Sequence, residues 1–217
     1  MCSHYEAVRQ REKFLRHFRA GLPPDMGPHD VWPGYSACFI RRPAHADAGD
    51  AAVPAREALA GLFGMVPHWS RDSTIARHTY NARTETVAEK PSFREAWRQA
   101  RHCIVPAAAF YEPDWRSGRA VPTRISRSDG EPMGLAGLWA RWTAPTGEFV
   151  HSFTMLTINA DAHAFMRNFQ KPGEEKRMVV ILPEDRYDAW LQAAPQDSMD
   201  FMRPYPAQRL AAAGSSP

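Results

Sequence analysis

The hydrophobic residues of this chain fall mainly into short apolar or alternating runs, a pattern typical of β-strands. Such runs predict strands over residues 35–41, 59–66, 102–111, 121–126, 133–142, 149–158 and 178–182. Helical spacing, or a proline suited to a first helical turn, predicts helices over 5–20, 91–100, 160–168 and 183–193. Because strands and helices do not alternate regularly, we expect an α+β fold. Its sheet should be curved, barrel-like and mainly antiparallel, with flanking helices.

The segments between these elements indicate a single domain. The first helix has one apolar face, formed by Phe14, Leu15 and Phe18. A stretch rich in alanine, aspartate and proline over 43–56 predicts a loop. The chain shows no internal repeat, so we expect one domain over residues 1–205, followed by a disordered tail over 206–217.

Composition and charge narrow the class of protein only slightly. The 217 residues are 44% hydrophobic and 24% charged, which suits one globular domain. No apolar run approaches the ~18 residues of a membrane span, and the first residues are too polar for a secretory signal. The net charge of +3 is too small to prove a polyanionic partner. Basic residues gather within 1–20 and 116–127, where they could contact phosphate or simply form solvated faces.

The cysteines are Cys2, Cys38 and Cys103, and their spacing matches no metal site. We therefore expect no metal and no cofactor, and a reducing cytoplasm as the compartment. Cys2 is the most informative of the three. Removal of Met1 would give it an α-amine and a thiol on adjacent carbons, and this pair condenses with an aldehyde to a thiazolidine. Both groups have ordinary pKa values of roughly 8 to 8.5, so modest tuning could activate either. An inconsequential small second residue is the ordinary alternative.

Three further segments could carry chemistry. Asn81 and Arg83 lie in a polar cluster, where the amide could hold a reacting group and the guanidinium could clamp a phosphate. A polar turn with solvated side chains is the alternative. Glu112 ends an apolar strand, and desolvation there would raise its pKa and suit it to general acid–base catalysis. Otherwise its side chain is merely exposed. A cationic loop before the 178–182 strand could position an anion, or could be an ordinary surface loop.

In their order and spacing, these features resemble the SOS response-associated peptidase (SRAP) family. The matching motifs are Met1-Cys2, Asn81-Ala82-Arg83-Thr84-Glu85-Thr86, Tyr111-Glu112-Pro113, and Arg177-Met178 before an apolar strand. Pro33-Gly34 and the segment 64–69 also match, although Phe63 stands where the family usually has tryptophan. The resemblance spans residues 2 to about 183.

The resemblance implies an enzyme of the DNA-damage (SOS) response that binds abasic sites in single-stranded DNA. Removal of Met1, attributed in the family to a thiol autopeptidase activity, would leave Cys2 to form a covalent thiazolidine cross-link with the ring-opened sugar. Asn81 would then orient the amine or a sugar oxygen, and Glu112 would shuttle protons. Arg83 would grip a phosphate, and Trp69 would wedge or stack at the lesion, where stacking contributes about 1–3 kcal/mol per base. Arg177 would also contact the DNA.

The chain departs from the family pattern at two predicted DNA contacts. His4 stands where the family usually has arginine, so a phosphate-binding cation is lost or weakened. Gln170 stands where we expect the family's histidine, and it can hydrogen-bond a sugar hydroxyl but cannot shuttle protons. His163 is a possible substitute.

Two other functions stay open: a thiol peptidase acting on itself or other proteins, and a noncovalent module that binds single-stranded DNA. We expect a monomer in the cytoplasm, associated with the nucleoid and not with a membrane.

Overall fold

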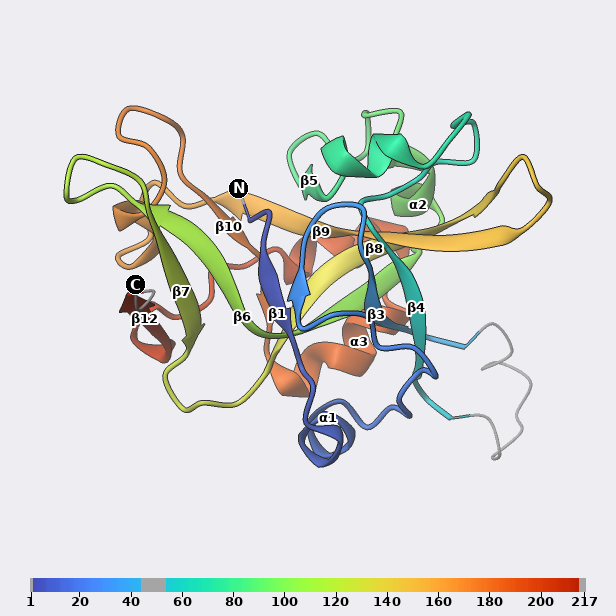
Figure 1. Ribbon diagram of the computed structural model, residues 1–217, viewed down its shortest axis with the longest axis horizontal. Coiled ribbons are helices and arrows are strands. Elements are labelled where there is room, and N and C mark those ends of the chain that lie inside the picture. Colours follow the sequence, from blue (N-terminus) through green and yellow to red (C-terminus); the bar gives the residue numbers. More distant parts are fainter. Residues whose placement is uncertain (1, 44–53, 215–217) are drawn as a thin grey trace.

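A computed structural model describes residues 2–43 and 54–214 of the chain (Figure 1). Its centre is a closed barrel in which each strand pairs with the next, in the order β8-β9-β4-β3-β6 and back to β8. These strands are β3 (Ser36–Arg41), β4 (Glu57–Phe63), β6 (His102–Asp114), β8 (Met133–Thr143) and β9 (Phe149–Asn159). Every pairing around the barrel is antiparallel except that of β4 with β9. The expected α+β fold with a barrel-like, mainly antiparallel sheet is therefore confirmed.

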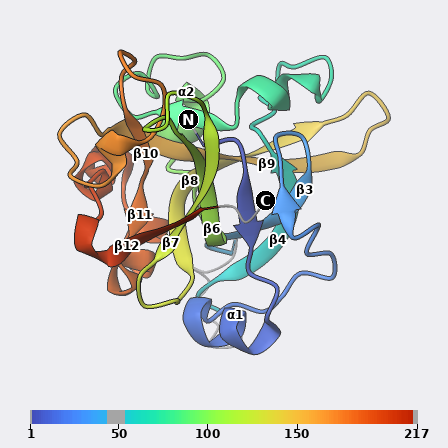
Figure 2. The same ribbon diagram turned by 60° about the vertical axis from the view of Figure 1, so that its left-hand side comes forward.

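Shorter strands extend the barrel at its margins (Figures 1 and 2). On one side β6 also pairs with β1 (Tyr5–Ala7) and β7 (Val121–Arg127), and these pair in turn with β2 (Asp30–Val31) and β12 (Leu210–Gly214). On the other side β9 pairs with β5 (Asn81–Arg83) and β10 (Arg177–Val179), and β8 pairs with β11 (Ile181–Leu182). The α-helices flank the sheet and are α1 (Arg11–Phe18), α2 (Arg94–Arg98) and α3 (Tyr187–Gln192). Short 3-10 helices cover Thr74–His78, Met166–Asn168, Glu184–Arg186, Pro195–Phe201 and Ala207–Arg209.

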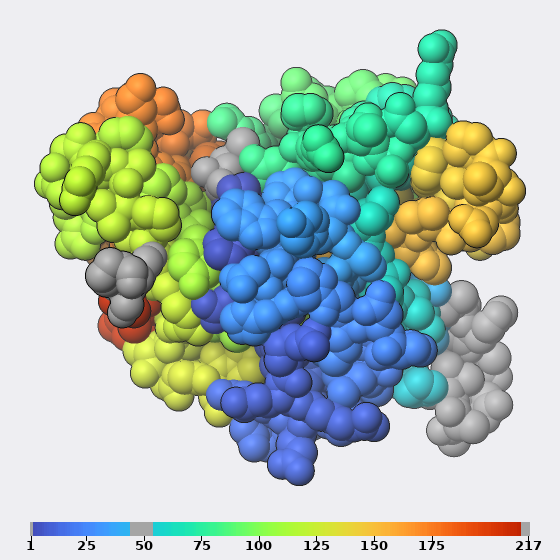
Figure 3. Space-filling model, viewed as in Figure 1, coloured from blue at the N-terminus to red at the C-terminus, as the bar shows by residue number. Residues whose placement is uncertain are grey.

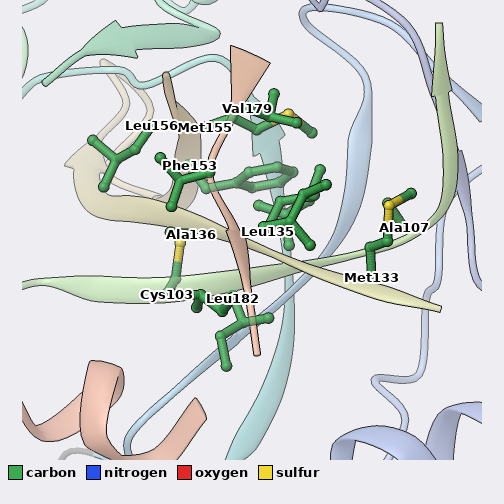
Figure 4. Packing of buried hydrophobic residues seen from close by; sticks show 14 of the residues in the cluster. Cys103, Ala107, Met133, Leu135, Ala136, Phe153, Met155, Leu156, Val179 and Leu182 are labelled. Atoms are coloured by element: carbon green, nitrogen blue, oxygen red, sulfur yellow. The ribbon is translucent and has the colours of Figure 1, made fainter. Parts of the chain in front are cut away.

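Apolar side chains fill the barrel (Figure 4). Leu135, Phe153 and Met155 are fully buried, and Leu182 of β11 closes the cluster from outside the ring of strands. The Phe153 ring lies 5.6 Å from the rings of two other buried phenylalanines, Phe39 and Phe63. Burying a phenylalanine side chain contributes roughly 1.5–3 kcal/mol, so this cluster fixes the strands whose ends carry the polar residues.

The N-terminal prediction is partly wrong. Residues 5–7 form strand β1 instead of the start of a helix, because β6 offers them backbone hydrogen bonds and a buried place for Tyr5. The helix itself is limited to α1, which ends where Arg19 adopts a left-handed conformation with φ of 50°. Phe14 and Phe18 are buried as expected, whereas Leu15 is 38% exposed.

The C-terminal half contains further corrections. The expected helix over 160–168 is only a 3-10 turn over Met166–Asn168, and the strand over 178–182 is divided at Val180 between β10 and β11. A disordered tail from residue 206 is wrong as far as residue 214, because β12 pairs with β7 along its whole length. Most of the predicted loop over 43–56 lies outside the described residues.

None of the helices in the described part of the chain is long and apolar enough to cross a membrane.

Gly64 directly follows β4, and its backbone conformation provides a test of the fold. Its φ is +118°, and an added Cβ would lie 1.9 Å from the carbonyl oxygen of Ala76. We expect Gly64→Ala to lower the free energy of unfolding by more than about 2 kcal/mol, because the clash adds to the backbone strain. Gly118 also has a positive φ but open space around it, so Gly118→Ala should cost only about 1–2 kcal/mol. Urea denaturation of both variants would contradict this if the two losses were equal.

Candidate active site

The pairing of β1 with β6 determines where Cys2 lies. Tyr5 stands opposite Phe110, and one step earlier the Tyr111 N–H donates to the His4 carbonyl at 2.9 Å. The chain before β1 therefore follows β6 toward Glu112. The Cys2 thiol donates to the same His4 carbonyl, with Sγ 3.4 Å from the oxygen, and Cys2 is 1% exposed. In Figure 3 only narrow dark-blue patches of the first residues lie between the light-blue β3 region and the yellow-green β6–β7 region.

Asn81 approaches Cys2 from a different part of the barrel. Strand β5 pairs in parallel with β9, with Asn81 opposite Met155, and this places the amide over the N-terminal segment. The Asn81 Nδ2 donates to the Cys2 carbonyl at 2.7 Å. Its Oδ1 is buried and has no hydrogen-bond partner among the described groups. Leaving a buried acceptor unsatisfied costs about 1–3 kcal/mol, so the site has an acceptor ready for a donor that arrives later.

Glu112 is the buried carboxyl of the site. It is 2% exposed, and burial raises its pKa above the ordinary value, an effect that a hydrogen bond from Gln170 partly offsets. Burial and, to a smaller extent, the nearby Glu112 carboxylate together raise the pKa of the Cys2 thiol to about 12. Cys2, Asn81 and Glu112, which the sequence analysis singles out separately, therefore converge on one buried site.

Tyr80 belongs to this site and was not predicted. Burial raises the pKa of its phenol, and the charges of Cys2 and Glu112 raise it in the same direction. A tyrosine before a polar cluster carries no signal of its own, and only its position next to Asn81 could have suggested it.

Gln170 stands beside Glu112 and is held rigidly. Its Oε1 accepts from the Arg177 N–H at 2.9 Å, and its Nε2 donates to the Arg177 carbonyl at 2.8 Å and also to the Glu112 carboxylate. The Gln170 N–H donates to the Pro113 carbonyl at 2.7 Å, and its φ is 64°, a conformation uncommon for a residue other than glycine. These contacts place an uncharged donor against the buried carboxyl.

His163 does not substitute for the missing family histidine. Its Nε2 bonds to the Tyr205 carbonyl at 2.7 Å, and its Nδ1 accepts the N–H groups of Phe165 and Met166. Both ring nitrogens are thus occupied by backbone groups, and the ring stabilises the turn that contains Met166.

Arg177, which we expected to contact DNA, is instead buried and paired with carboxylates. The residue is 2% exposed, and its guanidinium bonds to the carboxylates of Glu85 and Glu175 and to Thr157. A buried cation is tolerated when it is paired in this way. Arg177 thus joins β10 to β9 and to the segment after β5, and it is not free to meet a phosphate in this arrangement.

His4 likewise does not present a free cation. Its ring lies between those of Trp32 and Tyr111, with centroids 4.2 Å away on each side and interplanar angles of 10° and 8°. Its Nε2 bonds to Asp30 at 2.8 Å. Trp32 lies at the outer end of this stack and is 43% exposed, and nothing in the sequence singled it out.

The other two predicted DNA contacts are exposed. Trp69 is 49% exposed and lies in a turn that Trp142 anchors through a bond from Nε1 to the Ser70 carbonyl. The Arg83 side chain is 47% exposed and pairs with Glu175 at 2.7 Å.

A five-strand barrel carries a buried cysteine, amide and carboxyl where the N-terminal segment of the chain runs beside β6. This combination defines a class of protein. The family model described as SOS response associated peptidase (SRAP) matches residues 1–215. The chain belongs to this family.

Relatives and solved structures agree with this assignment. The chain is 32% identical over 161 residues to the abasic site processing protein YoqW of Bacillus subtilis, a match that covers 69% of this chain and 65% of that protein. It is 24% identical over 221 residues to the abasic site processing protein HMCES of Gallus gallus, covering 90% of this chain and 62% of that protein. A protein of Bordetella bronchiseptica with a solved structure is 48% identical, has a TM-score of 0.89, and is covered completely by 99% of this chain. A Bacteroides thetaiotaomicron structure, 21% identical with a TM-score of 0.73, covers 97% of this chain and is itself covered to 90%; it shares the fold.

The raised pKa of Glu112 predicts a pH-dependent cost to stability. A carboxyl whose pKa is higher in the folded than in the unfolded chain stabilises the fold only while it stays protonated, so wild-type stability should fall as the pH rises through the folded pKa. Glu112→Gln removes this ionisation. We expect the variant to be more stable than the wild type at pH 7–8. The advantage should shrink as the pH falls towards about 4.5, the ordinary carboxyl value, and should stay constant below it. Urea denaturation midpoints of both proteins across this pH range measure the difference in stability. An advantage of the variant that grew at low pH would contradict a raised pKa for Glu112.

Proposed function

We propose that this protein binds abasic sites in single-stranded DNA and becomes covalently joined to them through Cys2 after loss of Met1. The convergence of Cys2, Asn81 and buried Glu112 on one site carries the proposal. Family membership and the names of the relatives support abasic sites as the target. The chain spans 65% of YoqW, so activity, substrate and partner are all part of the proposal.

The proposed chemistry is a condensation without any redox change. Hydrolysis of the bond between Met1 and Cys2 exposes the α-amine. The neutral amine attacks the aldehyde carbon of the ring-opened sugar to form a carbinolamine, which loses water to become an imine. The Cys2 sulfur then attacks the imine carbon, and the thiol proton moves to the imine nitrogen. One thiazolidine ring forms, and one water molecule is released.

Glu112 is suited to the proton transfers in this sequence. A carboxyl with a raised pKa can be protonated when the carbinolamine loses its hydroxyl, and ionised when the thiol must lose its proton. Gln170 fixes the carboxyl by donating a hydrogen bond but cannot exchange a proton with it at neutral pH. Glu112 would therefore be the proton shuttle, without help from a histidine.

Asn81 would hold the reacting amine. Its Nδ2 already donates to the Cys2 carbonyl, while its buried Oδ1 accepts no hydrogen bond from the residues that the structure describes. An α-amine generated at Cys2 supplies the N–H donor that this oxygen lacks. The new cationic form of the amine would also lower the pKa of the thiol, since a nearby positive charge favours the thiolate.

The DNA itself would be bound by exposed groups around this site. Arg83 has a guanidinium suited to a backbone phosphate, and Trp69 has an exposed ring suited to stacking on a base or at the lesion. His4 and Arg177 would support the site by holding neighbouring segments, since both are already bound to carboxylates.

A thiol peptidase that acts on other proteins is less well supported. Peptidase cysteines attack as thiolates with lowered pKa values, whereas the pKa of the Cys2 thiol is raised to about 12, and the condensation proposed above begins with the amine instead of the thiol. Self-processing at Met1 remains part of the proposal only as one route to the free amine. A noncovalent DNA-binding module has no need for the unsatisfied Asn81 oxygen or the buried Glu112.

The thiazolidine requires the sulfur of Cys2 specifically. We expect wild-type protein to form a heat-stable adduct with single-stranded DNA containing one abasic site, seen as a shifted band on a denaturing gel. Cys2→Ser should give no heat-stable band, but should give one with cyanoborohydride, which traps the imine of its remaining amine. Cys38→Ala, which changes a buried cysteine in β3, serves as the control and should cross-link normally. A heat-stable adduct from Cys2→Ser without reductant would refute the thiazolidine, and intact mass would show whether Met1 is absent.

Glu112 should affect the rate of cross-linking more than DNA binding. General acid–base groups typically contribute 10²–10⁴-fold, so we expect Glu112→Gln to slow adduct formation by at least about 10²-fold at pH 7. Its affinity for intact single-stranded DNA should stay within about twofold of wild type. Single-turnover gels and fluorescence anisotropy measure the two quantities. An unchanged rate would remove Glu112 from the mechanism, and equal losses of rate and affinity would make it a binding residue.

A further inference from the structure

Glu175 fills an anion site built by other parts of the chain. Its Oε2 accepts from Arg83 Nη1 at 2.7 Å, and its Oε1 accepts from Arg177 Nη1 at 2.8 Å and from Asn159 Nδ2 at 3.2 Å. Two guanidinium groups and one amide, from three different strands, thus converge on one carboxylate. The hydrogen bond from Arg177 is the main cause that lowers the pKa of Glu175, so this carboxylate is ionised near neutral pH.

The two arginines depend on Glu175 to different degrees. Arg177 is buried and keeps two bonds to the Glu85 carboxylate, at 2.8 and 2.9 Å, whatever Glu175 does. Arg83 is half exposed, and within the described ranges Glu175 is its one ion-pair partner. Departure of Glu175 would therefore release Arg83 to solvent while Arg177 stayed neutralised in place.

The chain around Glu175 allows such a departure. Residues 171–175 are all exposed, whereas Gln170 and Arg177 on either side are buried and hydrogen-bonded to each other. Lys176 is held separately, since its N–H donates to Asp161 and its Nζ bonds to the Gln170 and Lys171 carbonyls. The Glu175 side chain can leave Arg83 without disturbing the contacts that hold Gln170 against Glu112.

We propose that Glu175 is an affinity-determining residue that occupies Arg83 in place of a DNA phosphate and is displaced when the strand binds. The inference rests on the proposed function, because it takes Arg83 as a phosphate contact. A carboxylate and a phosphodiester both carry one negative charge and accept from the same guanidinium, so they compete for it directly. Binding of DNA then includes the loss of the ion pair between Arg83 and Glu175, which lowers affinity and favours strands whose phosphate reaches this position.

Glu174 provides a matched control for a test of this competition. Its side chain is 64% exposed, and its recorded ion pair is with Lys171 at 4.0 Å, so Glu174→Gln removes the same charge one residue away without touching Arg83. The probe is a fluorescent single-stranded oligonucleotide without an abasic site, which excludes covalent capture. We expect Glu175→Gln to bind about two- to fivefold more tightly than wild type at 0.1 M salt, the range that loss of an exposed ion pair allows. Glu174→Gln should stay within about 1.5-fold of wild type.

A double variant distinguishes the contact between Arg83 and Glu175 from a general effect of removing a negative charge. In an Arg83→Gln background, Glu175→Gln should no longer increase affinity, because the group that it releases is gone. Equal gains from Glu174→Gln and Glu175→Gln, a persistent gain without Arg83, or no gain at all would overturn the competition. Failure of wild-type protein to bind the oligonucleotide or to cross-link abasic DNA would instead refute the proposed function. Thermal unfolding of each variant identifies any loss of DNA affinity that misfolding causes.

Discussion

The site depends on the antiparallel pairing of the three-residue strand β1 with β6. Its register sets Tyr5 opposite Phe110 and so brings Cys2 alongside the end of β6, where Glu112 is buried. A slip of one residue would turn each side chain of β1 to the opposite face of the sheet. Tyr5 opposes such a slip because it is fully buried, with its ring 5.3 Å from that of Phe63.

A second set of contacts locks this pairing from the outer face. Glu6 accepts from Arg124 of β7 through both of its oxygens and from the Tyr111 hydroxyl at 2.7 Å. Tyr111 also stacks on His4, so one side chain of β6 holds two nearby residues of the N-terminal segment.

The barrel supplies the rigidity of the site, whereas the polar groups gathered at its end are individually unfavourable. A buried carboxyl, a thiol with a raised pKa and an unsatisfied amide oxygen persist together because the surrounding apolar core holds them there.

The barrel strands were predictable because each is long and has a clear apolar pattern. Closure of the barrel and the parallel contact of β4 with β9 were not, since they depend on pairing between distant segments. Strand β1 was mistaken for helix because three residues carry too little periodicity to compete with the helical spacing that follows. The tail was mistaken for disorder because the alanines of β12 are held by backbone hydrogen bonds to β7, which leave no mark on side-chain pattern.

The same reasoning applies to the site. Cys2, Asn81 and Glu112 were singled out one at a time from their own chemistry, and only the resemblance to a family suggested that they act together. No local pattern shows that they meet. The ion pairs of Arg177 with Glu85 and Glu175 were hidden because one partner is distant in sequence, so the sequence suggested a DNA contact at an arginine that is buried between carboxylates. Tyr80 and Trp32 were missed for a similar reason, since each gains its importance only from neighbours that the fold supplies.

Strand β12 has a consequence for the handling of the molecule. It covers the edge of β7 with an antiparallel pairing from Leu210 to Gly214, and the inner side of β7 pairs with the part of β6 that carries Glu112. Shortening the polypeptide before Leu210 would expose a row of unpaired backbone groups, a ready template for association with another copy. Aggregation of such a truncated protein would then originate at β7, a long way along the chain from the deletion but on the strand next to the one that carries Glu112.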